Sequence, residues 1–546
     1  MLLPGVLPVK SQCLPFSQIR HTTRLFLDYL SFTPAVQAFY PRSPMFSEWL
    51  REEAGQIRYD EARRQKVSSI LETQNRQFGS GEKTFANIER LRRGAAAAVT
   101  GQQVVLFGGP LFTIFKALTA IRLAEEATAA GVDCVPVFWL ATEDHDLAEV
   151  NHTSLASESG TPERLAIESR GSDDAPVGTI RLGEEIAPVV DRAVALLGDS
   201  RAASWLRESY RPGETMGSAF ARLMARLFAD WGVILLDQSD PAFHELARPV
   251  FRQAAERAEE LDTALLAQGK ALEAAGYHQQ VKVTPASTLL FELQRGARTP
   301  VRRKNDSAEG HFMVGESRST AVELLARIDS NPENFSPNAL LRPVVQDYLL
   351  PTLVYTGGPA EVAYFAQAAV VYEKLLGRVT PILPRFSATI VEPKAERLLE
   401  RYQLSLPDLF AGPDKVRQIV AARTLPSDLQ DRFAAARTTL EQSMNAVRET
   451  LGRLDATLAD AASNAEEKMK YQLSQLEARA ARAEAQRNEV LTRHADSLNG
   501  ALYPNKELQE REVAGVSFVA RYGPELLTSL HDCIRPDCHD HQVISF

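Results

Sequence analysis

The sequence of 546 residues has very few cysteines and no long apolar run. Its four cysteines are Cys13, Cys134, Cys533 and Cys538. So few cysteines do not form the disulfide framework typical of small secreted domains, and a reducing compartment is expected. No stretch reaches the ~18 apolar residues of a transmembrane helix. The first apolar run is short and broken by Pro4 and Pro8, which disfavours a signal peptide. We therefore predict a cytoplasmic protein without a membrane partner.

Basic blocks and the common phosphate-binding motifs are also absent. The sequence has 61 Lys and Arg against 70 Asp and Glu, a formal net charge of −9. This balance disfavours a nucleic-acid partner, transfer RNA included. Neither a G-x4-G-K-[ST] loop nor a G-x-G-x-x-G fingerprint is present, so the two most familiar nucleotide-binding signatures are missing.

Short apolar runs that alternate with helical segments predict an α/β fold with a parallel sheet. Leu111 to Ala129 has a strongly helical pattern and lies between the first two runs. The strand candidates are Ala95–Thr100, Cys134–Leu140, Val233–Asp237, Val354–Gly358 and Val379–Pro384. Within Gly276–Val314 the residues alternate in polarity, which predicts a β-rich insertion.

These patterns divide the chain into four parts. Residues 1–84 form an N-terminal helical segment that joins the core. Residues 85–425 form the core, with insertions near 155–230 and 276–335. Residues 426–503 form a coiled-coil domain, and residues 504–546 return to the core.

The third part lacks proline from Ser427 to Tyr503 and repeats apolar residues at steps of four and three. This spacing predicts a coiled-coil seam that serves folding or dimerisation. The seam begins with Leu440, Met444, Val447, Leu451, Leu454 and Leu458. Asn464 and its small neighbours are the candidate tip of a hairpin.

Ligands of open α/β sheets bind at the carboxyl ends of the strands. The first such place is the loop that follows Ala95–Thr100 and leads into the helix bearing Lys116. Its candidate binding residues are Gly101, Gln102, Gln103, Gly108 and Gly109. Pro110 suits the first turn of that helix, whose N-terminus could hold an anion. The alternative is a tight turn that simply requires glycine.

The second place is the cluster Glu143, Asp144, His145 and Asp146, which follows the second strand. Three carboxylates and an imidazole could bind Mg²⁺, hold a substrate ammonium group or supply a general base. The alternative is a solvated helix start, where acidic residues favour the helix dipole.

Two further strand ends carry cations and glycines. Arg342, with Gln346 one turn later, could grip a carboxylate or phosphate through two parallel hydrogen bonds. Gly357, Gly358 and Glu361 form a second glycine turn before a helix, and Arg385 follows the last strand. At each place an ordinary turn or surface charge remains the alternative.

The C-terminal tail contains Cys533, Cys538, His539 and His541, which could form a tetrahedral zinc site. The Cys-x4-Cys spacing is not a common zinc pattern, so no metal ligand is assigned. Cys134 lies inside a strand and is interpreted as a small buried hydrophobic residue.

Four long segments together resemble the BshC family, the cysteine-adding ligases of bacillithiol biosynthesis. These segments are TGQQVVLFGGPLFTIFKA, VPVFWLATEDHDLAEVNH, LRPVVQDYLLPTLVYTGGPAEVAYFAQ and PILPRFSATIVEP. The likeness runs from about Ser17 to the RYGPELL and HQV segments near the end. It implies a Rossmann-like core with two connecting-peptide insertions, and a coiled coil that mediates homodimers. The candidate residues from Gly101 to Glu361 given above match the family motifs.

The resemblance also implies a reaction, in which L-cysteine is joined to glucosaminyl-malate through an amide to give bacillithiol. Because a free carboxylate does not form an amide in water without activation, ATP is the expected energy source, with Mg²⁺ as a further candidate. The chain departs from the family at Phe115, where many members have a histidine. The alternative function is a non-catalytic, nucleotide-binding coiled-coil scaffold or sensor of the thiol pathway.

Overall fold

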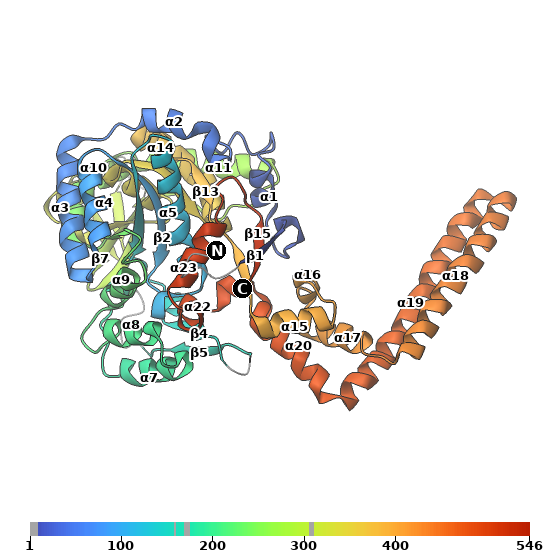
Figure 1. The fold of residues 1–546 in the computed structure, drawn as a ribbon. Coiled ribbons are helices and arrows are strands. Elements are labelled where there is room, and N and C mark those ends of the chain that lie inside the picture. Colours follow the sequence, from blue (N-terminus) through green and yellow to red (C-terminus); the bar gives the residue numbers. More distant parts are fainter. Residues whose placement is uncertain (1–8, 158–159, 169–174, 305–310) are drawn as a thin grey trace. The chain divides into compact units, whose positions relative to one another are not determined.

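A computed structural model describes residues 9–157, 160–168, 175–304 and 311–546 (Figure 1). Residues 1–8, which include Pro4 and Pro8 of the run judged unlike a signal peptide, lie outside these ranges. The chain forms two compact units. The first comprises residues 1–156, 163–389 and 510–544, and the second comprises 157–162, 390–509 and 545–546. In the described residues, no helix has the length and apolar character that crossing a membrane requires.

A five-stranded parallel sheet forms the centre of the first unit. Its strands are β2 (Ala96–Gln103), β3 (Cys134–Ala141), β6 (Ile234–Asp237), β12 (Thr352–Gly357) and β13 (Ile382–Pro384). Their order is β13-β12-β2-β3-β6, and every pair is parallel. Nearly all their residues are buried, as expected of a parallel sheet covered on both faces. The predicted α/β class with a parallel sheet is therefore confirmed.

Helices of the first unit cover this sheet. They are α1 (Arg24–Leu30), α2 (Phe46–Gln56), α3 (Glu61–Phe78), α4 (Glu82–Arg92), α5 (Phe112–Ala129), α10 (Pro241–Glu256), α11 (Ala258–Ala274), α13 (Arg342–Leu349) and α14 (Pro359–Leu376). Helix α5 packs against β2, β3 and β12, whereas α3 and α4 pack against β6. Cys134 is buried in β3 as predicted, and burial raises the pKa of its thiol to about 12.

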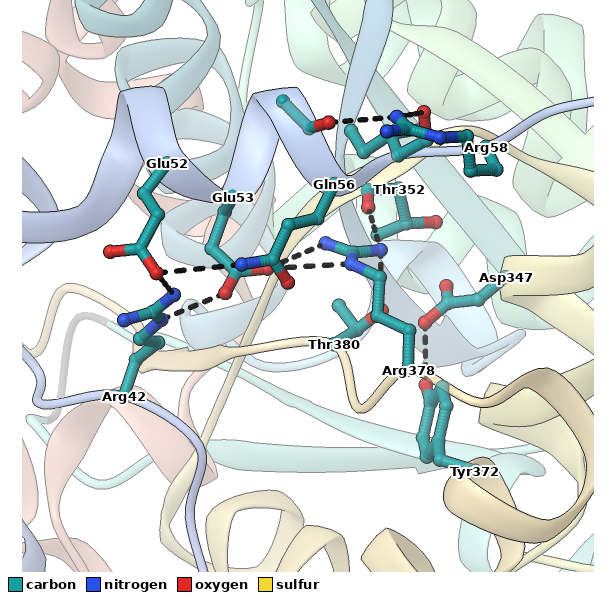
Figure 2. A network of polar contacts seen from close by, with 12 residues as sticks. Arg42, Glu52, Glu53, Gln56, Arg58, Asp347, Thr352, Tyr372, Arg378 and Thr380 are labelled. Atoms are coloured by element: carbon teal, nitrogen blue, oxygen red, sulfur yellow. Dashed lines mark hydrogen bonds and ion pairs between the residues drawn. The ribbon is translucent and has the colours of Figure 1, made fainter.

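A buried polar network ties the N-terminal segment to the amino-terminal end of the sheet (Figure 2). Glu53 of α2 is 3% exposed and accepts a hydrogen bond from Nε of Arg42 at 2.8 Å. Its other oxygen lies 3.1 Å from NH2 of Arg378. Arg378 in turn donates to the carbonyl of Thr352, where β12 begins, at 2.9 Å. This network lies at the opposite end of β12 from the predicted ligand sites.

Two insertions interrupt the core. The first contains α6 (Leu147–Val150), β4 (His152–Leu155), β5 (Glu163–Ala166), α7 (Ile186–Leu197), α8 (Arg201–Ser209) and α9 (Met216–Leu227). The second contains β7 (Ser287–Gln294), β8 (Ala297–Lys304), β9 (His311–Val314), β10 (Ser317–Ser319), α12 (Ala321–Ser330) and β11 (Phe335–Pro337). Its strands form an antiparallel sheet in the order β10-β9-β8-β7-β11. The predicted β-rich character of this region is confirmed.

The second unit is helical. Its helices are α15 (Pro393–Arg401), α16 (Leu406–Leu409), α17 (Pro413–Ala422), α18 (Ser427–Leu454), α19 (Ala456–Arg487) and α20 (Glu489–Leu502). Helices α18 and α19 pack together as a long hairpin (Figure 1). The seam is only partly buried, because Leu454 is 78% exposed and Val447 is 45% exposed.

The predicted hairpin tip at Asn464 is wrong. The chain turns at Asp455, whose extended backbone (φ −157°, ψ 131°) separates the two helices. The Asp455 side chain accepts a hydrogen bond from the backbone N–H of Thr457 at 2.8 Å and so caps α19. Asn464 lies inside α19, where small residues allow close helix packing and do not end the helix.

The C-terminal segment supplies α21 (Gln509–Glu512), α22 (Gly515–Tyr522), α23 (Glu525–Cys533) and β15 (His541–Ser545). Helices α22 and α23 pack against α5 in the first unit. Strand β15 lies between β1 (Lys10–Leu14) and β14 (Ala388–Val391) in a three-stranded sheet.

Candidate active site

The order of the parallel strands fixes where a ligand can bind. The chain passes from β2 outward to β3 and β6, and then returns to the other side of β2 for β12 and β13. The strand order therefore reverses between β2 and β12. In open α/β sheets, ligands bind in the crevice outside the carboxyl ends of the strands at such a switch point.

A cavity of about 740 Å³ lies at this point. Its volume is within the range of small-molecule sites. The predicted site residues that line it are Gly101, Gln102, Gln103, Lys116, Asp144, His145, Arg342, Gly358, Glu361 and Arg385. The topology thus gathers residues from strand ends far apart in the sequence.

A buried ion pair joins the two sides of the switch point. Nζ of Lys116 on α5 lies 2.6 Å from Oε2 of Glu361 on α14. The same ammonium group donates to the carbonyl of Gly101 at 2.8 Å and to Oε1 of Gln102 at 2.9 Å. Glu361 also accepts from the hydroxyl of Tyr355 at 2.6 Å.

The protonation of this pair follows from its surroundings. Burial lowers the pKa of Lys116, but the Glu361 carboxylate favours its charged form. Although burial opposes ionisation of Glu361, the ion pair with Lys116 holds the pKa of Glu361 below its usual value. Both groups are therefore charged and engaged with each other, so we assign them to holding the shape of the site.

Arg342 provides a cation without a carboxylate partner among the described residues. It is the first residue of α13, and its NH2 donates to the hydroxyl of Tyr364 at 2.9 Å. Its NH1 donates to Oε1 of Gln346 at 3.2 Å. Its guanidinium carbon lies 5.7 Å from the centre of the Tyr355 ring. These hydrogen-bond partners are neutral. The nearby carboxylate of Glu361 acts on Arg342 electrostatically but is ion-paired with Lys116, so a ligand carboxylate can still bind Arg342.

Arg385 differs from Arg342, because its charge is balanced within the protein. Its NH2 lies 2.7 Å from Oε1 of Glu510, and both side chains are almost fully buried. The guanidinium carbon lies 5.1 Å from the centre of the Phe112 ring. Arg385 lines the cavity as the predicted second cation, with its charge paired to Glu510.

Two carboxylates of the cavity wall lie close together. Nε2 of Gln103 donates to Oδ2 of Asp144 at 2.6 Å and to Oε2 of Glu149 at 2.9 Å. One amide group therefore draws two carboxylates together. Carboxylates have spare acceptor capacity beyond one hydrogen bond each, which suits an ammonium group. Glu149 is one turn beyond the predicted cluster and was missed because only consecutive acidic residues were considered.

The cluster at the end of β3 does not act as one group. Asp144 and His145 line the cavity, whereas Glu143 points into the protein and lies 2.6 Å from Nε2 of His244. Although burial opposes its charge, Glu143 raises the pKa of His244 above the usual value. Asp146 caps α6 by accepting from the N–H of Glu149 at 3.2 Å. Glu143 and Asp146 therefore have structural roles.

Four other predicted positions also do not line the cavity: Gly108, Gly109, Gln346 and Gly357. Gly109 has a φ of +72°, and a Cβ there would lie 3.0 Å from Cβ of Val105. A Cβ on Gly357 would lie 2.7 Å from Cβ of Glu361. These glycines are required by backbone conformation and close packing. Gln346 instead supports Arg342.

The N-terminus of α5, predicted to hold an anion, is partly engaged within the protein. Pro110 precedes the helix, which begins at Phe112, so the predicted first-turn proline is wrong. The backbone N–H of Leu111 is taken by the carbonyl of Val513 at 2.8 Å. Phe115, where many members of the resembled family have a histidine, is fully buried 5.1 Å from the ring centre of Phe386. It therefore packs in the core instead of facing a ligand.

Several lining residues were not predicted. Arg298 comes from β8 of the second insertion, which carries no recognisable motif. Tyr355 and Tyr364 lie inside the VYTGGPAEVAY segment, in which only Gly357, Gly358 and Glu361 were predicted to bind ligand. Gln238 follows β6 and accepts from Nε1 of Trp139 at 2.6 Å.

The described residues contain no group of three or more His, Cys, Asp or Glu side chains arranged to hold a metal ion. In the C-terminal tail, Cys533 and Cys538 are free thiols. Nε2 of His539 contacts the carbonyl of Pro44 at 2.7 Å. His541 is enclosed by two hydroxyl groups, and burial lowers its pKa to about 4. The tail residues thus face separate partners.

Comparison with known proteins identifies the family. The model described as "Bacillithiol biosynthesis BshC, N-terminal Rossmann-like domain" matches residues 9–386. The model described as "Bacillithiol biosynthesis BshC, C-terminal coiled-coil domain" matches residues 388–546.

Full-length relatives agree. A protein of Koribacter versatilis named "Putative cysteine ligase BshC" is 50% identical over 97% of this chain and 99% of its own length. Relatives of the same name from Solibacter usitatus and Geobacillus thermodenitrificans are 38% and 29% identical, over 97% and 96% of this chain and 99% and 98% of their own lengths. The chain therefore belongs to the BshC family of bacillithiol biosynthesis, and it is a ligase that combines a Rossmann-like domain with a coiled-coil domain.

Proposed function

We propose that this cavity joins L-cysteine to glucosaminyl-malate through an amide bond, as the last step of bacillithiol biosynthesis. The observation that carries the proposal is the presence of an arginine and two carboxylates in one cavity. Within the described residues Arg342 has no ion-paired carboxylate, and Asp144 and Glu149, which share the amide of Gln103, line the same cavity. A dicarboxylate and an amino acid are the kinds of substrate that such a site complements.

Arg342 is assigned to the carboxylates of the malate group. A guanidinium group binds a carboxylate through two parallel hydrogen bonds, and burial strengthens charge-assisted contacts. The start of α14 at Gly358 and Pro359 also lines the cavity. A helix N-terminus favours negative charge, and at α14 the carboxylate of Glu361 already takes that place by accepting from the N–H of Gly358 at 2.7 Å.

Asp144 and Glu149 are assigned to the ammonium group of cysteine. The shared hydrogen bonds from Gln103 hold the two carboxylates close together, and an ammonium ion relieves their mutual repulsion. ATP, with Mg²⁺ as its counterion, would supply the activation of the carboxylate when bound. The chain's own residues bind and orient the two substrates and exclude water between them.

We also propose that the protein acts in the cytoplasm as a homodimer joined by its coiled-coil domain. Apolar side chains remain exposed along α18 and α19, namely Val447, Leu454, Met469, Tyr471 and Leu476. A second copy would bury them and gain hydrophobic stabilisation. Light scattering on the purified protein tests this: a dimer mass is expected, and a monomer at micromolar concentration would contradict it.

The functional test is ligation by the purified protein. Glucosaminyl-malate, L-cysteine, ATP and Mg²⁺ are supplied, and products are identified by mass spectrometry. Asp144→Asn separates an enzyme from a scaffold, because an enzyme loses turnover whereas a scaffold loses only ligand affinity. Arg122→Gln is the matched control, because Arg122 pairs with Glu126 on the surface of α5 and does not line the cavity. Release of AMP or of ADP would identify the mode of activation.

A further inference from the structure

His145 lines the cavity, and the closest polar partner of its ring is an arginine. NH1 of Arg298 lies 3.2 Å from Nδ1 of His145. Oδ1 of Asp144 lies 3.8 Å from the same nitrogen, which is too far for a hydrogen bond. The centre of the Phe291 ring lies 5.8 Å from the centre of the imidazole and brings no charge. The contact that decides the state of the ring is therefore the one with Arg298.

Two other hydrogen bonds and one ring contact fix the orientation of the Arg298 guanidinium, with NH1 directed at His145. Its Nε donates to Oγ of Ser336 at 2.9 Å, and its NH2 donates to the carbonyl of Pro337. Its guanidinium carbon lies 3.9 Å from the centre of the Phe291 ring. Each nitrogen of the guanidinium thus has its own acceptor, and the acceptor of NH1 is His145.

This contact fixes the imidazole chemically. A guanidinium has only donors and stays protonated in proteins. Nδ1 of His145 must therefore accept with its lone pair, which leaves the single ring proton on Nε2. A doubly protonated ring would place an N–H group and a positive charge against Arg298. The carboxylate of Asp144 lies beside the same nitrogen, Nδ1, but is not hydrogen-bonded to the ring, and together with Glu143 it acts electrostatically on Arg298. Glu149 shares the amide of Gln103 with Asp144.

We propose that Arg298 holds His145 as a neutral imidazole whose Nε2–H donates a hydrogen bond to a carboxylate or acyl oxygen of the substrate. Among the described residues Nε2 has no hydrogen-bond partner, and His145 lines the cavity. His145 therefore binds substrate without transferring a proton, contrary to the general-base role that its sequence context suggests. Arg298 is a positioning residue. The identity of the oxygen rests on the proposed ligase function, whereas the state of the ring does not.

Nuclear magnetic resonance of the full-length protein with ¹⁵N-labelled histidine tests the state of the ring. The sequence has ten histidines, and His145→Gln identifies the signal of His145. One protonated and one bare ring nitrogen, with the proton on Nε2, are expected at about pH 8, where the tautomer is read directly. A proton on Nδ1, or equal population of the two tautomers, would overturn the proposal.

Arg298→Met removes the donor and keeps an apolar chain of similar length. The ring proton of His145 is then expected to be shared between Nδ1 and Nε2. Arg303→Met, on the same strand, removes an arginine paired with Glu259 and should leave the His145 signal unchanged. If Arg298→Met leaves the tautomer as it was, Arg298 is not its cause and the proposal fails.

Turnover tests the donor role. His145→Gln keeps an N–H donor that cannot titrate, and His145→Ala removes the donor. We expect kcat to fall by about 10²–10³-fold in the alanine variant, the usual effect of losing a preorganised donor, and to recover at least tenfold with glutamine. Equal activity of the two variants would refute the donor role. The resonance experiment needs no turnover, so it remains decisive even if the ligase assay gives no product.

Discussion

Replacing Glu510 by glutamine should destabilise the first unit by several kilocalories per mole. Glu510 accepts hydrogen bonds from NH2 of Arg385 at 2.7 Å, from Oγ of Ser387 at 3.0 Å and from the N–H of Ala388 at 3.0 Å. These donors engage both carboxylate oxygens of Glu510. The NH2 group of a glutamine side chain would therefore face at least one of these N–H or O–H donors. The substitution also leaves Arg385 buried without a counterion.

The magnitude follows from the burial of the pair, whose side chains are 4% and 2% exposed. Removing one partner of a buried pair costs about 3–5 kcal/mol. A unit of about 420 residues has an unfolding entropy of about 0.9 kcal/mol/K at the midpoint. The midpoint of thermal unfolding is therefore expected to fall by about 3–6 °C.

Tryptophan fluorescence is the appropriate assay, because all four tryptophans (Trp49, Trp139, Trp205 and Trp231) lie in the first unit. The matched control is Glu125→Gln, which removes a 52%-exposed carboxylate that lies 2.9 Å from His531. His531 is buried, but solvent screens the exposed carboxylate of Glu125, so the pair should contribute at most about 1 kcal/mol and the control should shift the midpoint by about 1 °C or less. Equal shifts for the two variants would refute the claim that burial gives this pair its weight.

The pH dependence gives an independent check on the same pair. Although burial opposes ionisation, Arg385 holds the pKa of Glu510 below its usual value. The ionised Glu510 therefore stabilises the fold above its unfolded-state pKa, and this stabilisation is lost as the pH falls through its lower folded-state pKa. The difference in stability between wild type and Glu510→Gln should shrink in acid.

Three further predictions concern stability and use the same fluorescence assay. The pKa of His541 is about 4 in the folded protein and about 6.5 in the unfolded chain, so about 3 kcal/mol of folding stability should be lost as the pH falls from about 6.5 to about 4. His541→Asn should not show this loss. A His541→Asn variant with the same pH profile of stability as wild type would contradict the prediction. Gly109→Ala should lower the free energy of unfolding more than Gly131→Ala does. Both glycines have positive φ, which costs an alanine about 1–2 kcal/mol, but only at Gly109 would the new Cβ meet a neighbouring side chain. Equal losses of stability would exclude the steric contribution at Gly109. Glu53→Gln should lower the free energy of unfolding by about 3–5 kcal/mol, because the largely buried Arg378 then lacks its carboxylate partner (Figure 2). A loss below about 1 kcal/mol would show that this network contributes little to stability.

The parallel sheet and the location of the site could be predicted from the sequence because both depend on local patterns. Buried apolar runs such as Cys134–Leu140 must form strands covered on both faces, and ligands bind where such strands end. The rule brought Gln103, Asp144 and Arg342 into one cavity. Family resemblance added the connecting insertions and the coiled coil.

The roles of individual side chains could not be predicted, because they depend on partners that are distant in sequence. Glu143 and Asp144 are neighbours in the chain, but Glu143 pairs with His244 inside the protein, whereas Asp144 faces the cavity. The ion pair between Lys116 and Glu361 likewise joins residues from the two sides of the switch point. The turn at Asp455 did carry a local signal, since aspartate is a favoured helix cap, but the even apolar spacing masked it.

The most direct test of the central claim is mass spectrometry of the purified protein incubated with glucosaminyl-malate, L-cysteine, ATP and Mg²⁺, with Arg342→Gln beside the wild type. The account predicts a product with the mass of bacillithiol from the wild type and from Arg122→Gln, and a loss of at least about 10²-fold with Arg342→Gln, because a bidentate charged contact is removed. No product from a folded wild-type protein that still binds its substrates would contradict the proposed ligation, and an Arg342→Gln variant as active as wild type would contradict the assignment of Arg342 to the malate carboxylates.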